Sequence, residues 1–239
     1  MIKIEKTDVF GWDSAIRGMR NPMNSWDKSD SNFECRDCEG CYYINDSHVE
    51  RQEYGCVVDV WCNHKALRVG QNDLDLMKKL VNAGSDHSKF MRMITVYCDI
   101  TAPLYWWKEY DTYKVGTVAN SCSTMHKIHA KEFKLDDFSI EHLLPDEAIE
   151  FMKHLVDGLN FYRIKYLETN DKKYWWQIIQ LLPSSYNQKR TVQLNYAVLR
   201  NMYHARKNHK LDEWRAFCGW VETLPYAKDL ICEKGKENV

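Results

Sequence analysis

The stretch LPSSYNQKRTVQLNYAVLRNMYHAR, residues 182–206, decides the expected fold of this chain. Its Pro183 follows a run with helical apolar spacing and marks the end of that helix, because proline cannot continue one. A loop is expected next, and a second helix begins twelve residues after the proline at Asn195. This helix carries an Asn-x-x-x-Leu-x-Asn-x-x-x-x-Arg pattern that ends on Asn201 and Arg206. Amides six residues apart lie about 120° apart round a helix, so both can face one ligand.

Apolar patterning outside this stretch predicts a small sheet with long helices. Residues 91–100, MRMITVYCDI, alternate apolar and polar side chains, which indicates a strand with one buried face. The opening MIKI indicates another strand, and residues 21–65 are expected to be an extended loop with a short strand at residues 56–61. Helical spacing recurs in residues 12–19, 72–84, 103–113, 145–159, 172–182 and 211–224. The expected class is α+β, a small mixed or antiparallel sheet packed with long helices in a single domain over residues 1–239.

Residue types typical of helix ends occur in two of the expected helices. Asn72 or Asp73 is expected to cap the helix of residues 72–84, and Gly84 stands where that helix ends. Pro145 is expected to start the following long helix.

The charge balance excludes broad electrostatic attraction to nucleic acid or membranes. Lysine and arginine total 33 and aspartate and glutamate total 34, a net charge of -1. No run approaches the roughly 18 apolar residues of a membrane helix. The N-terminus has no apolar signal core, so the chain is expected to be cytoplasmic.

The cysteines indicate a candidate metal site. Five of the nine lie within the first 62 residues, inside an expected inserted loop of residues 30–65. Two-residue gaps allow thiolates to converge within about 2.3 Å of a zinc ion. An iron–sulfur cluster and plain reduced thiols are the alternatives. The candidate ligands are Cys35, Cys38 and Cys41 with Cys56 or Cys62, and His64 also lies downstream.

Three segments together resemble the flavin-dependent thymidylate synthase family. In that family a Leu-Pro, a loop with a threonine (Thr191 here) and the Asn-x-x-x-Leu-x-Asn-x-x-x-x-Arg helix follow one another at the spacing of residues 182–206. Residues 86–92 are similar to its Thr-Pro-Phe-Glu-His stretch. Residues 103–126 stand where it has Arg-His-Arg-x-x-Ser-x-Asn-Glu-x-Ser-x-Arg-Tyr. The resemblance covers about residues 70–225, with a further match at residues 1–20.

The resemblance implies the cofactor, the substrates and the assembly. It implies FAD, with reduced folate and NADPH as co-substrates, and transfer of a one-carbon unit or hydride to a pyrimidine nucleotide. It also implies a homotetramer with active sites between subunits. The implied catalytic residue is Arg206, the implied flavin-binding residues are Asn195, Asn201, Arg206 and Lys114, and the implied substrate-binding residues are Asn120, Ser121, Ser123 and Glu109.

The signature departs from the family at its charged positions. Its Arg-His-Arg stands as Thr112-Tyr113-Lys114, its glutamate as Ser121, its later arginine as Met125, and the arginine before the Leu-Pro as Ile179. Each lost charge-assisted contact to phosphate is worth about 1.5–3 kcal/mol. The chain is therefore not expected to bind dUMP in the family's usual way.

Three alternatives stay open at this point. In the first, the chain is a non-catalytic nucleotide-binding or interaction protein on the same scaffold. In the second, the cysteine-rich loop makes a zinc-dependent nucleic-acid contact. For Arg206 itself, the alternative is a surface arginine paired with a neighbour such as Asp212.

Overall fold

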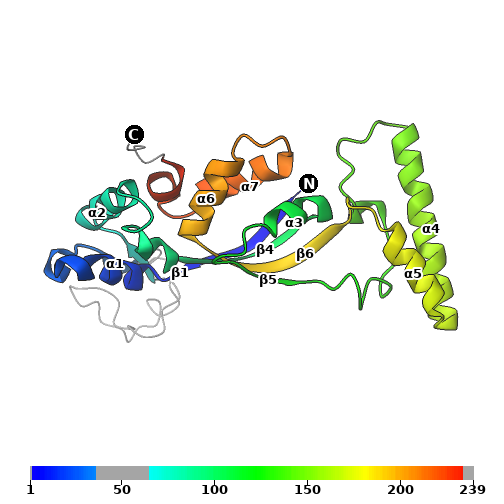
Figure 1. Ribbon diagram of the computed structural model, residues 1–239, viewed down its shortest axis with the longest axis horizontal. Coiled ribbons are helices and arrows are strands. Elements are labelled where there is room, and N and C mark those ends of the chain that lie inside the picture. The colour runs from blue at the N-terminus through cyan, green and yellow to red at the C-terminus, as the bar shows by residue number, and fades with distance from the viewer. Residues whose placement is uncertain (1, 36–64, 234–239) are drawn as a thin grey trace, which may run out of the picture. The chain divides into compact units, whose positions relative to one another are not determined.

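The computed structural model describes residues 2–35 and 65–233, which form two compact units. The first unit comprises residues 2–10 and 94–233, and the second comprises residues 11–35 and 65–93. Figure 1 labels their elements along the chain. The single domain expected over residues 1–239 stays a prediction.

The first unit contains a four-stranded antiparallel sheet with the order β1-β4-β6-β5. The strands span Lys3–Phe10 (β1), Thr95–Pro103 (β4), Val118–Ser121 (β5) and Asn187–Asn195 (β6). β4 and β6 pair along their whole length, from Thr95 opposite Asn195 to Pro103 opposite Asn187. The expected α+β class with a small antiparallel sheet is confirmed.

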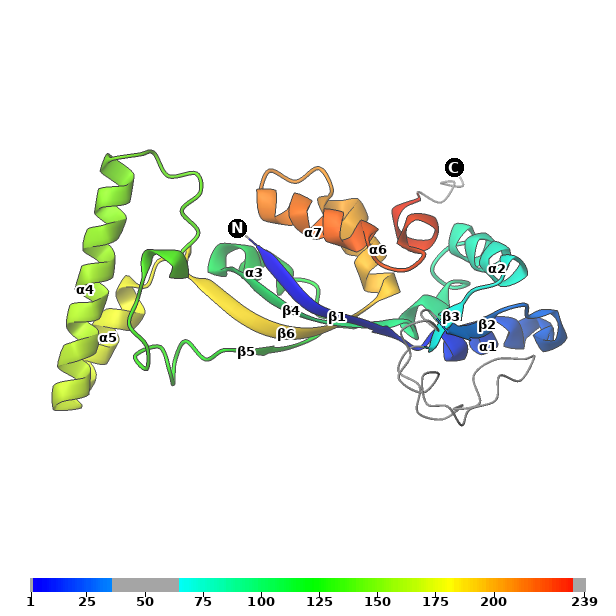
Figure 2. The same cartoon turned by 180° about the vertical axis from the view of Figure 1, so that it is seen from behind.

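One face of this sheet is covered by helices. The side chains of Ile94, Val96, Cys98 and Ile100 are buried, as their alternation predicts, while Tyr97 between them is exposed. Helices α3 (Leu104–Tyr110), α6 (Tyr196–Arg206) and α7 (Asp212–Glu222) lie on the same side of the sheet, as Figures 1 and 2 show. Their buried aromatic residues include Trp106, Trp107, Tyr196, Trp214 and Phe217.

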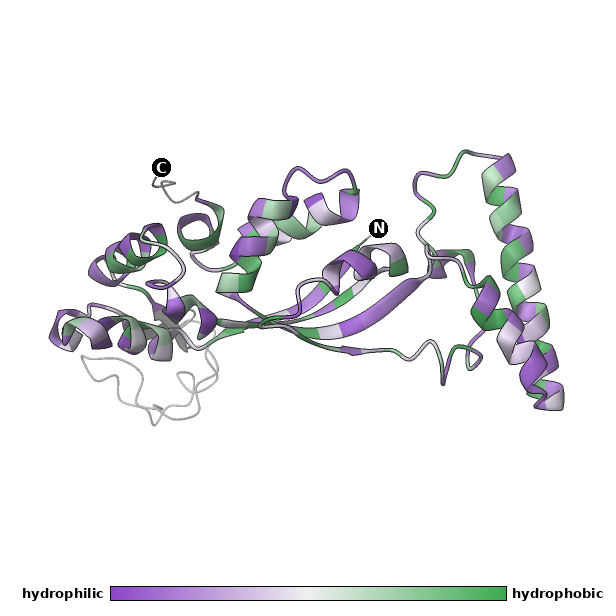
Figure 3. Cartoon of the chain, in the orientation of Figure 1, coloured by the Kyte–Doolittle hydropathy of each residue, from purple (hydrophilic) through white to green (hydrophobic). Residues whose placement is uncertain are grey.

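A helical pair makes a second core in the same unit. α4 (Glu147–Thr169) packs against α5 (Lys172–Leu181). Met152, Val156 and Leu159 of α4 are buried with Ile178 of α5, as the helical spacing predicts. Hydrophobic residues recur along the rest of α4 as well (Figure 3). Short helical turns complete the unit at Leu135–Asp137 and Lys228–Cys232.

The second unit joins two helices and a strand pair. α1 spans Trp12–Arg20, α2 spans Gln71–Asn82, and β2 (Asn32–Cys35) pairs antiparallel with β3 (Lys65–Arg68). Short helical turns lie at Asn21–Met23, Trp26–Lys28 and Lys89–Arg92.

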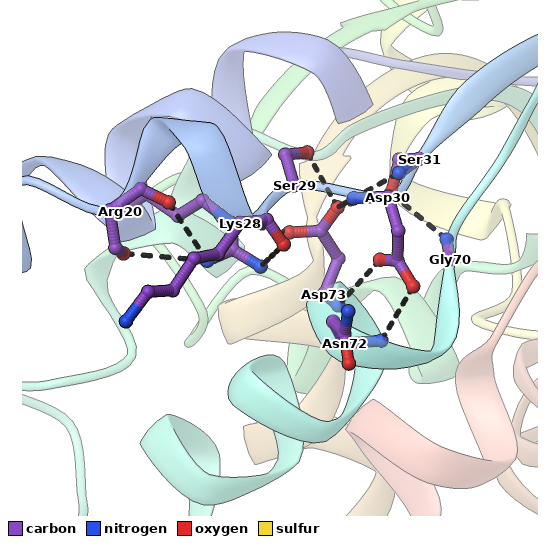
Figure 4. A network of polar contacts seen from close by, with 9 residues as sticks. Arg20, Lys28, Ser29, Asp30, Ser31, Gly70, Asn72 and Asp73 are labelled. Atoms are coloured by element: carbon purple, nitrogen blue, oxygen red, sulfur yellow. Dashed lines mark hydrogen bonds and ion pairs between the residues drawn. The ribbon is translucent and has the colours of Figure 1, made fainter.

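A buried ion pair links α1 to α2 in the second unit (Figure 4). Nε of Arg20 donates to Oδ1 of Asp73 at 2.6 Å, and both side chains are at least 96% buried. The second carboxylate oxygen of Asp73 accepts from the hydroxyls of Ser29 and Ser31 at 2.7 and 2.6 Å. Backbone N–H groups of Asp30 and Ser31 donate to the same oxygen. The segment before β2 is thereby fixed to α2.

The expected cap of α2 is wrong. Neither Asn72 nor Asp73 caps the helix, because both lie inside it. The carboxylate of Asp30 accepts their backbone N–H groups instead, at 2.9 and 3.1 Å. A side chain 42 residues away thus caps the helix, and Asp73 is released for the ion pair. Gly84 does follow the end of α2, with a φ of 107°.

Four strands were not expected, and a fifth begins later than expected. The region between Pro183 and Asn195 was expected to be a loop, but it contains β6 at the middle of the sheet. β5 and the β2–β3 pair were not expected either. β4 begins at Thr95, because residues 89–92 form a helical turn before it. The strand expected at residues 56–61 lies outside the described residues.

Candidate functional site

Two of the predicted site residues meet at the end of α6. Nη1 of Arg206 donates to Oε2 of Glu109 on α3 at 2.7 Å, although 97 residues separate them in sequence. The side chains are 21% and 33% exposed, so the ion pair is held by protein and reachable from solvent. Asp212, the alternative partner of Arg206, instead bonds with Arg215 and His142. The predicted catalytic residue Arg206 and one predicted substrate-binding residue, Glu109, therefore lie in one cluster.

Two further donors converge on the same carboxylate oxygen. Nε1 of Trp214 donates to Oε2 of Glu109 at 3.1 Å, and Nε2 of His209 lies 3.3 Å from it. The backbone N–H of Leu211 donates to Nδ1 of His209 at 3.2 Å. Nδ1 is therefore an acceptor, and Nε2 is the ring nitrogen that faces Glu109. Arg206 and Glu109 give the cluster one positive and one negative charge.

Aromatic rings fix the guanidinium of Arg206. Its Nε donates to the hydroxyl of Tyr113 at 2.9 Å. Its central carbon lies 5.0 Å from the ring centroid of Trp214 and 5.6 Å from that of Tyr113. Both distances suit cation–π attraction. Arg206 is thereby oriented by a carboxylate, a phenol and two ring faces.

The turn at residues 113–116 also reaches the start of α6. Nδ2 of Asn195 donates to the carbonyl of Gly116 at 3.3 Å, while its Oδ1 accepts the N–H of Val198. Gly116 has a φ of 78°, and a Cβ there would lie 2.6 Å from Nδ2 of Asn195, so only glycine fits without strain. Tyr113 and Gly116 thus tie one turn to both ends of α6, and this turn carries the exposed Lys114.

The two asparagines do not share one helical face. Asn195 precedes α6 as its N-cap in an extended conformation, with φ -135° and ψ 165°. The expectation that it lies about 120° from Asn201 round a helix is therefore wrong. Asn201 lies in α6 with its side chain exposed. Five residues separate it from Arg206, about 140° round the helix, so the two side chains diverge.

The remaining substrate-binding predictions lie on or after β5. Asn120 pairs with Thr191 and Ser121 with Arg190 across the β5–β6 ladder, and both are exposed. Ser123 follows the strand, where its hydroxyl accepts the N–H of His126 at 2.9 Å. Within the described part of the chain, no hydrogen bond or ion pair joins these three residues to Arg206.

A second arginine at the covered side of the sheet was not predicted. The guanidinium carbon of Arg190 lies 4.1 Å from the ring centroid of Trp107, and its Nη1 donates to Asp111 at 2.7 Å. Gln188 accepts from its Nε at 3.0 Å. Only the β6 pairing brings these residues together, so the sequence carried no signal for them. Arg190 and Arg206 are each offset by a carboxylate of the α3 region.

Two buried groups of the first unit stay protonated. Burial, with a smaller contribution from Asp99, raises the pKa of the Cys98 thiol to about 12. Burial also raises the pKa of the Tyr110 hydroxyl well above its ordinary value. Neither group therefore supplies an anion at neutral pH.

Three of the altered signature positions lie in different parts of the first unit. The Thr112 hydroxyl donates to the carbonyl of Glu109, Met125 is exposed, and Ile179 packs in the α4–α5 core. Short or apolar side chains thus stand at these three positions, where the resembling family has guanidinium groups.

The predicted metal ligands are largely beyond the described part of the chain. Cys38, Cys41, Cys56 and Cys62 lie outside it, as does His64, and Cys35 is the last residue of β2. Within residues 2–35 and 65–233, no group of three or more His, Cys, Asp or Glu side chains could hold a metal ion. In the same residues, no helix is both long and apolar enough to cross a membrane.

Comparison with solved structures identifies the fold. No protein-family model and no curated protein sequence matches the chain. Thymidylate synthase ThyX of Helicobacter pylori, with FAD and dUMP, matches with a TM-score of 0.63 at 15% identity over 97% of each chain. Another structure of that enzyme with the same ligands gives 0.62 at 16% identity, over 96% of this chain and 97% of that one. The UMP/dUMP methylase PolB of Streptomyces cacaoi, bound with 5-Br dUMP, gives 0.58 at 11% identity, over 98% and 96%. The chain therefore has the fold of the flavin-dependent thymidylate synthases.

Proposed function

We propose that this chain is a divergent flavin-dependent, thymidylate synthase-like enzyme. It acts on a pyrimidine nucleotide by one-carbon or hydride transfer, with FAD as cofactor and reduced folate and NADPH as co-substrates. The observation that carries the proposal is the oriented, partly exposed Arg206 beside Glu109. In the resembling family, the arginine at this position reaches the pyrimidine and the flavin.

The residues around α6 suit a flavin nucleotide. The exposed amide of Asn201 and the exposed ammonium of Lys114 offer donors for ring carbonyls and phosphates, and Arg206 adds a guanidinium. Asn195 is already engaged as a helix cap, so its proposed role is to hold the turn that carries Lys114. Bound flavin supplies the redox chemistry, and the protein supplies binding and orientation.

The lost guanidinium groups argue against dUMP bound in the usual mode. Several contacts of about 1.5–3 kcal/mol each are missing at the family's phosphate positions. Arg206 and Arg190 do not replace them freely, since Glu109 and Asp111 offset their charges. The proposed substrate is therefore a pyrimidine nucleotide held mainly through its ring or through a modified group.

A flavin spectrum and a turnover assay test this proposal. The purified protein is expected to be yellow or to take up added FAD, and to release tritium from a 5-tritiated uridine nucleotide with reduced folate and NADPH. Arg206→Lys is expected to lower turnover at least about tenfold, because a point charge loses the oriented fork. Arg17→Lys, at an exposed position of α1, is the matched control. A colourless protein that also fails to take up FAD contradicts the proposal.

Exposed apolar side chains support a homo-oligomer, proposed as a tetramer. Phe151 and Phe161 of α4 are 68% and 54% exposed, and Leu167 is 54% exposed. Trp176 and Leu181 of α5 are exposed as well. Such a surface is unusual on a monomer, and a stable interface buries about 800 Å² per partner. The proposed occupant is a second copy of this chain, and light scattering after size-exclusion chromatography measures the assembly.

The offset charge of Arg206 also favours one alternative, a nucleotide-binding protein without catalysis. A thermal-shift panel separates the two functions, because a binder responds to nucleotide without FAD. For residues 30–65, the proposed zinc site is tested by metal analysis of the protein and of its Cys38→Ser variant. Absence of zinc from both rules it out.

A further inference from the structure

The Glu109–Arg206 pair presents an acceptor beside a donor. Oε2 of Glu109 accepts from Arg206 and Trp214 and lies 3.3 Å from Nε2 of His209. Among the described residues, no hydrogen bond uses Oε1 of Glu109 or Nη2 of Arg206. These two atoms, called the edge of the pair below, have no hydrogen-bond partner among those residues, and the side chains that carry them are 33% and 21% exposed.

The orientation of this edge is fixed from several sides. Arg206 is held through Nε and Nη1, and Glu109 is held through three contacts to one oxygen. Arg206 and Glu109 carry one positive and one negative charge, so the pair disfavours a phosphate and suits a neutral polar edge.

A ring N–H flanked by carbonyl groups complements this edge. The N–H donates to Oε1 of Glu109 while an adjacent carbonyl accepts from Nη2 of Arg206. An imide carries a carbonyl on each side of its N–H, so it matches the pair in either orientation. The cytosine edge has its acceptor nitrogen at that central place and matches in one orientation only.

Resting on the proposed function, we propose that Glu109 and Arg206 together recognise the imide edge of a ring ligand, with Glu109 accepting the ring N3–H. Both uracil and the isoalloxazine of a flavin carry such an edge, so Glu109 is the residue that sets specificity for an imide. A glutamine would place an amide donor toward the N–H and lose this selection.

The test combines ligands whose ring N–H is blocked by a methyl group with a protein variant in which the acceptor Glu109 is replaced. Calorimetric titration of the full-length protein compares dUMP and UMP with their N3-methyl derivatives, with FAD present, and separately compares FAD with N3-methyl-FAD. The proteins are the wild type, Glu109→Gln, and Lys108→Gln as a control at the adjacent exposed position of α3. The methyl group's steric cost is similar in wild type and Glu109→Gln, because the two side chains have nearly the same shape.

Methylation is expected to weaken binding to wild type and Lys108→Gln by at least about tenfold more than binding to Glu109→Gln. If the nucleotides show this larger loss in the wild type than in Glu109→Gln, the edge binds the pyrimidine. If FAD shows it, the edge binds the flavin. Equal losses in wild type and Glu109→Gln for both ligands overturn the imide assignment while the proposed function stands. Failure of the wild type to bind any uridine nucleotide or FAD overturns both. The comparison within the wild type does not depend on the variant's folding.

Discussion

Replacing Asp73 by alanine is expected to destabilise the second unit strongly. The Asp73 side chain is fully buried and accepts from Arg20, Ser29 and Ser31. Its removal leaves a guanidinium that is 4% exposed without its counter-ion. Breaking a buried pair in this way costs about 3–5 kcal/mol. Arg20 keeps the carbonyls of Ser25 and Lys28, which places the expected loss toward the lower end, at about 3 kcal/mol.

The measurement is the free energy of unfolding in urea, followed by circular dichroism, with amide hydrogen exchange to locate the loss in α2. Asp75→Ala is the matched control, because Asp75 is exposed on the same helix and accepts a local hydrogen bond from Gln71. Its expected change is within about 0.5 kcal/mol. A loss below about 1 kcal/mol for Asp73→Ala, or one equal to the control, would refute the reasoning.

The dependence of stability on pH is an independent test of the same ion pair. Burial alone would raise the pKa of Asp73, but hydrogen bonds from Ser31, Ser29 and Arg20 outweigh it and hold that pKa below its ordinary value. A carboxyl with a depressed folded-state pKa stabilises the protein above its unfolded pKa, about 3.9, and loses that contribution as the pH falls through the folded value. Asp73→Asn is therefore expected to lose this acid-dependent part of the stability curve, and an unchanged slope below about pH 4 would contradict the assignment.

Three further outcomes are expected. Gly116→Ala should lower the free energy of unfolding by about 1–3 kcal/mol, because its φ of 78° and the crowded Cβ position both cost energy. Gly158→Ala, inside α4 with open space around it, should instead raise it by about 0.5–1 kcal/mol; urea titration of both variants reads the contrast, and equal signs would contradict it. Iodoacetamide at pH 8 should label the exposed Cys122 and spare Cys98, because Cys98 is buried and its pKa of about 12 keeps the thiol protonated. Peptide mass mapping measures the labelling, and equal rates for the two cysteines would be inconsistent with that burial. Phe161→Glu should lower the oligomer mass in light scattering, whereas an unchanged mass would place the interface elsewhere.

Helices and strands with periodic apolar residues were predicted well, because burial of one face produces a repeating apolar pattern along the sequence. The alternation around Cys98 matches the covered face of β4, and the spacing of Trp214, Phe217 and Val221 matches the buried face of α7. β6 was missed since Val192 and Leu194 are the only strongly apolar residues in its polar run. β5 was missed because all four of its residues are exposed, so its hydrogen bonds to β6 alone define it.

The candidate site was predicted residue by residue, but not as an arrangement. Arg206 and Glu109 were both identified through the family resemblance, and the structure brings them to 2.7 Å. His209 and Trp214 were not predicted as parts of this site. The hydrogen bond from Trp214 to Glu109 and the 3.3 Å approach of His209 depend on how α7 and the turn before it pack against α3, which local sequence does not encode.

By itself, the sequence determined the periodic helices, the buried face of β4 and the family resemblance, because these depend on neighbours along the chain. Only the tertiary structure decided that Asp30 caps α2, that Asp73 joins Arg20 in a buried pair, and that Glu109 offsets the charge of Arg206. The reason is physical: a buried or oriented charge is stabilised by whichever donor or acceptor the fold brings within about 3 Å, and that partner can lie anywhere in the sequence.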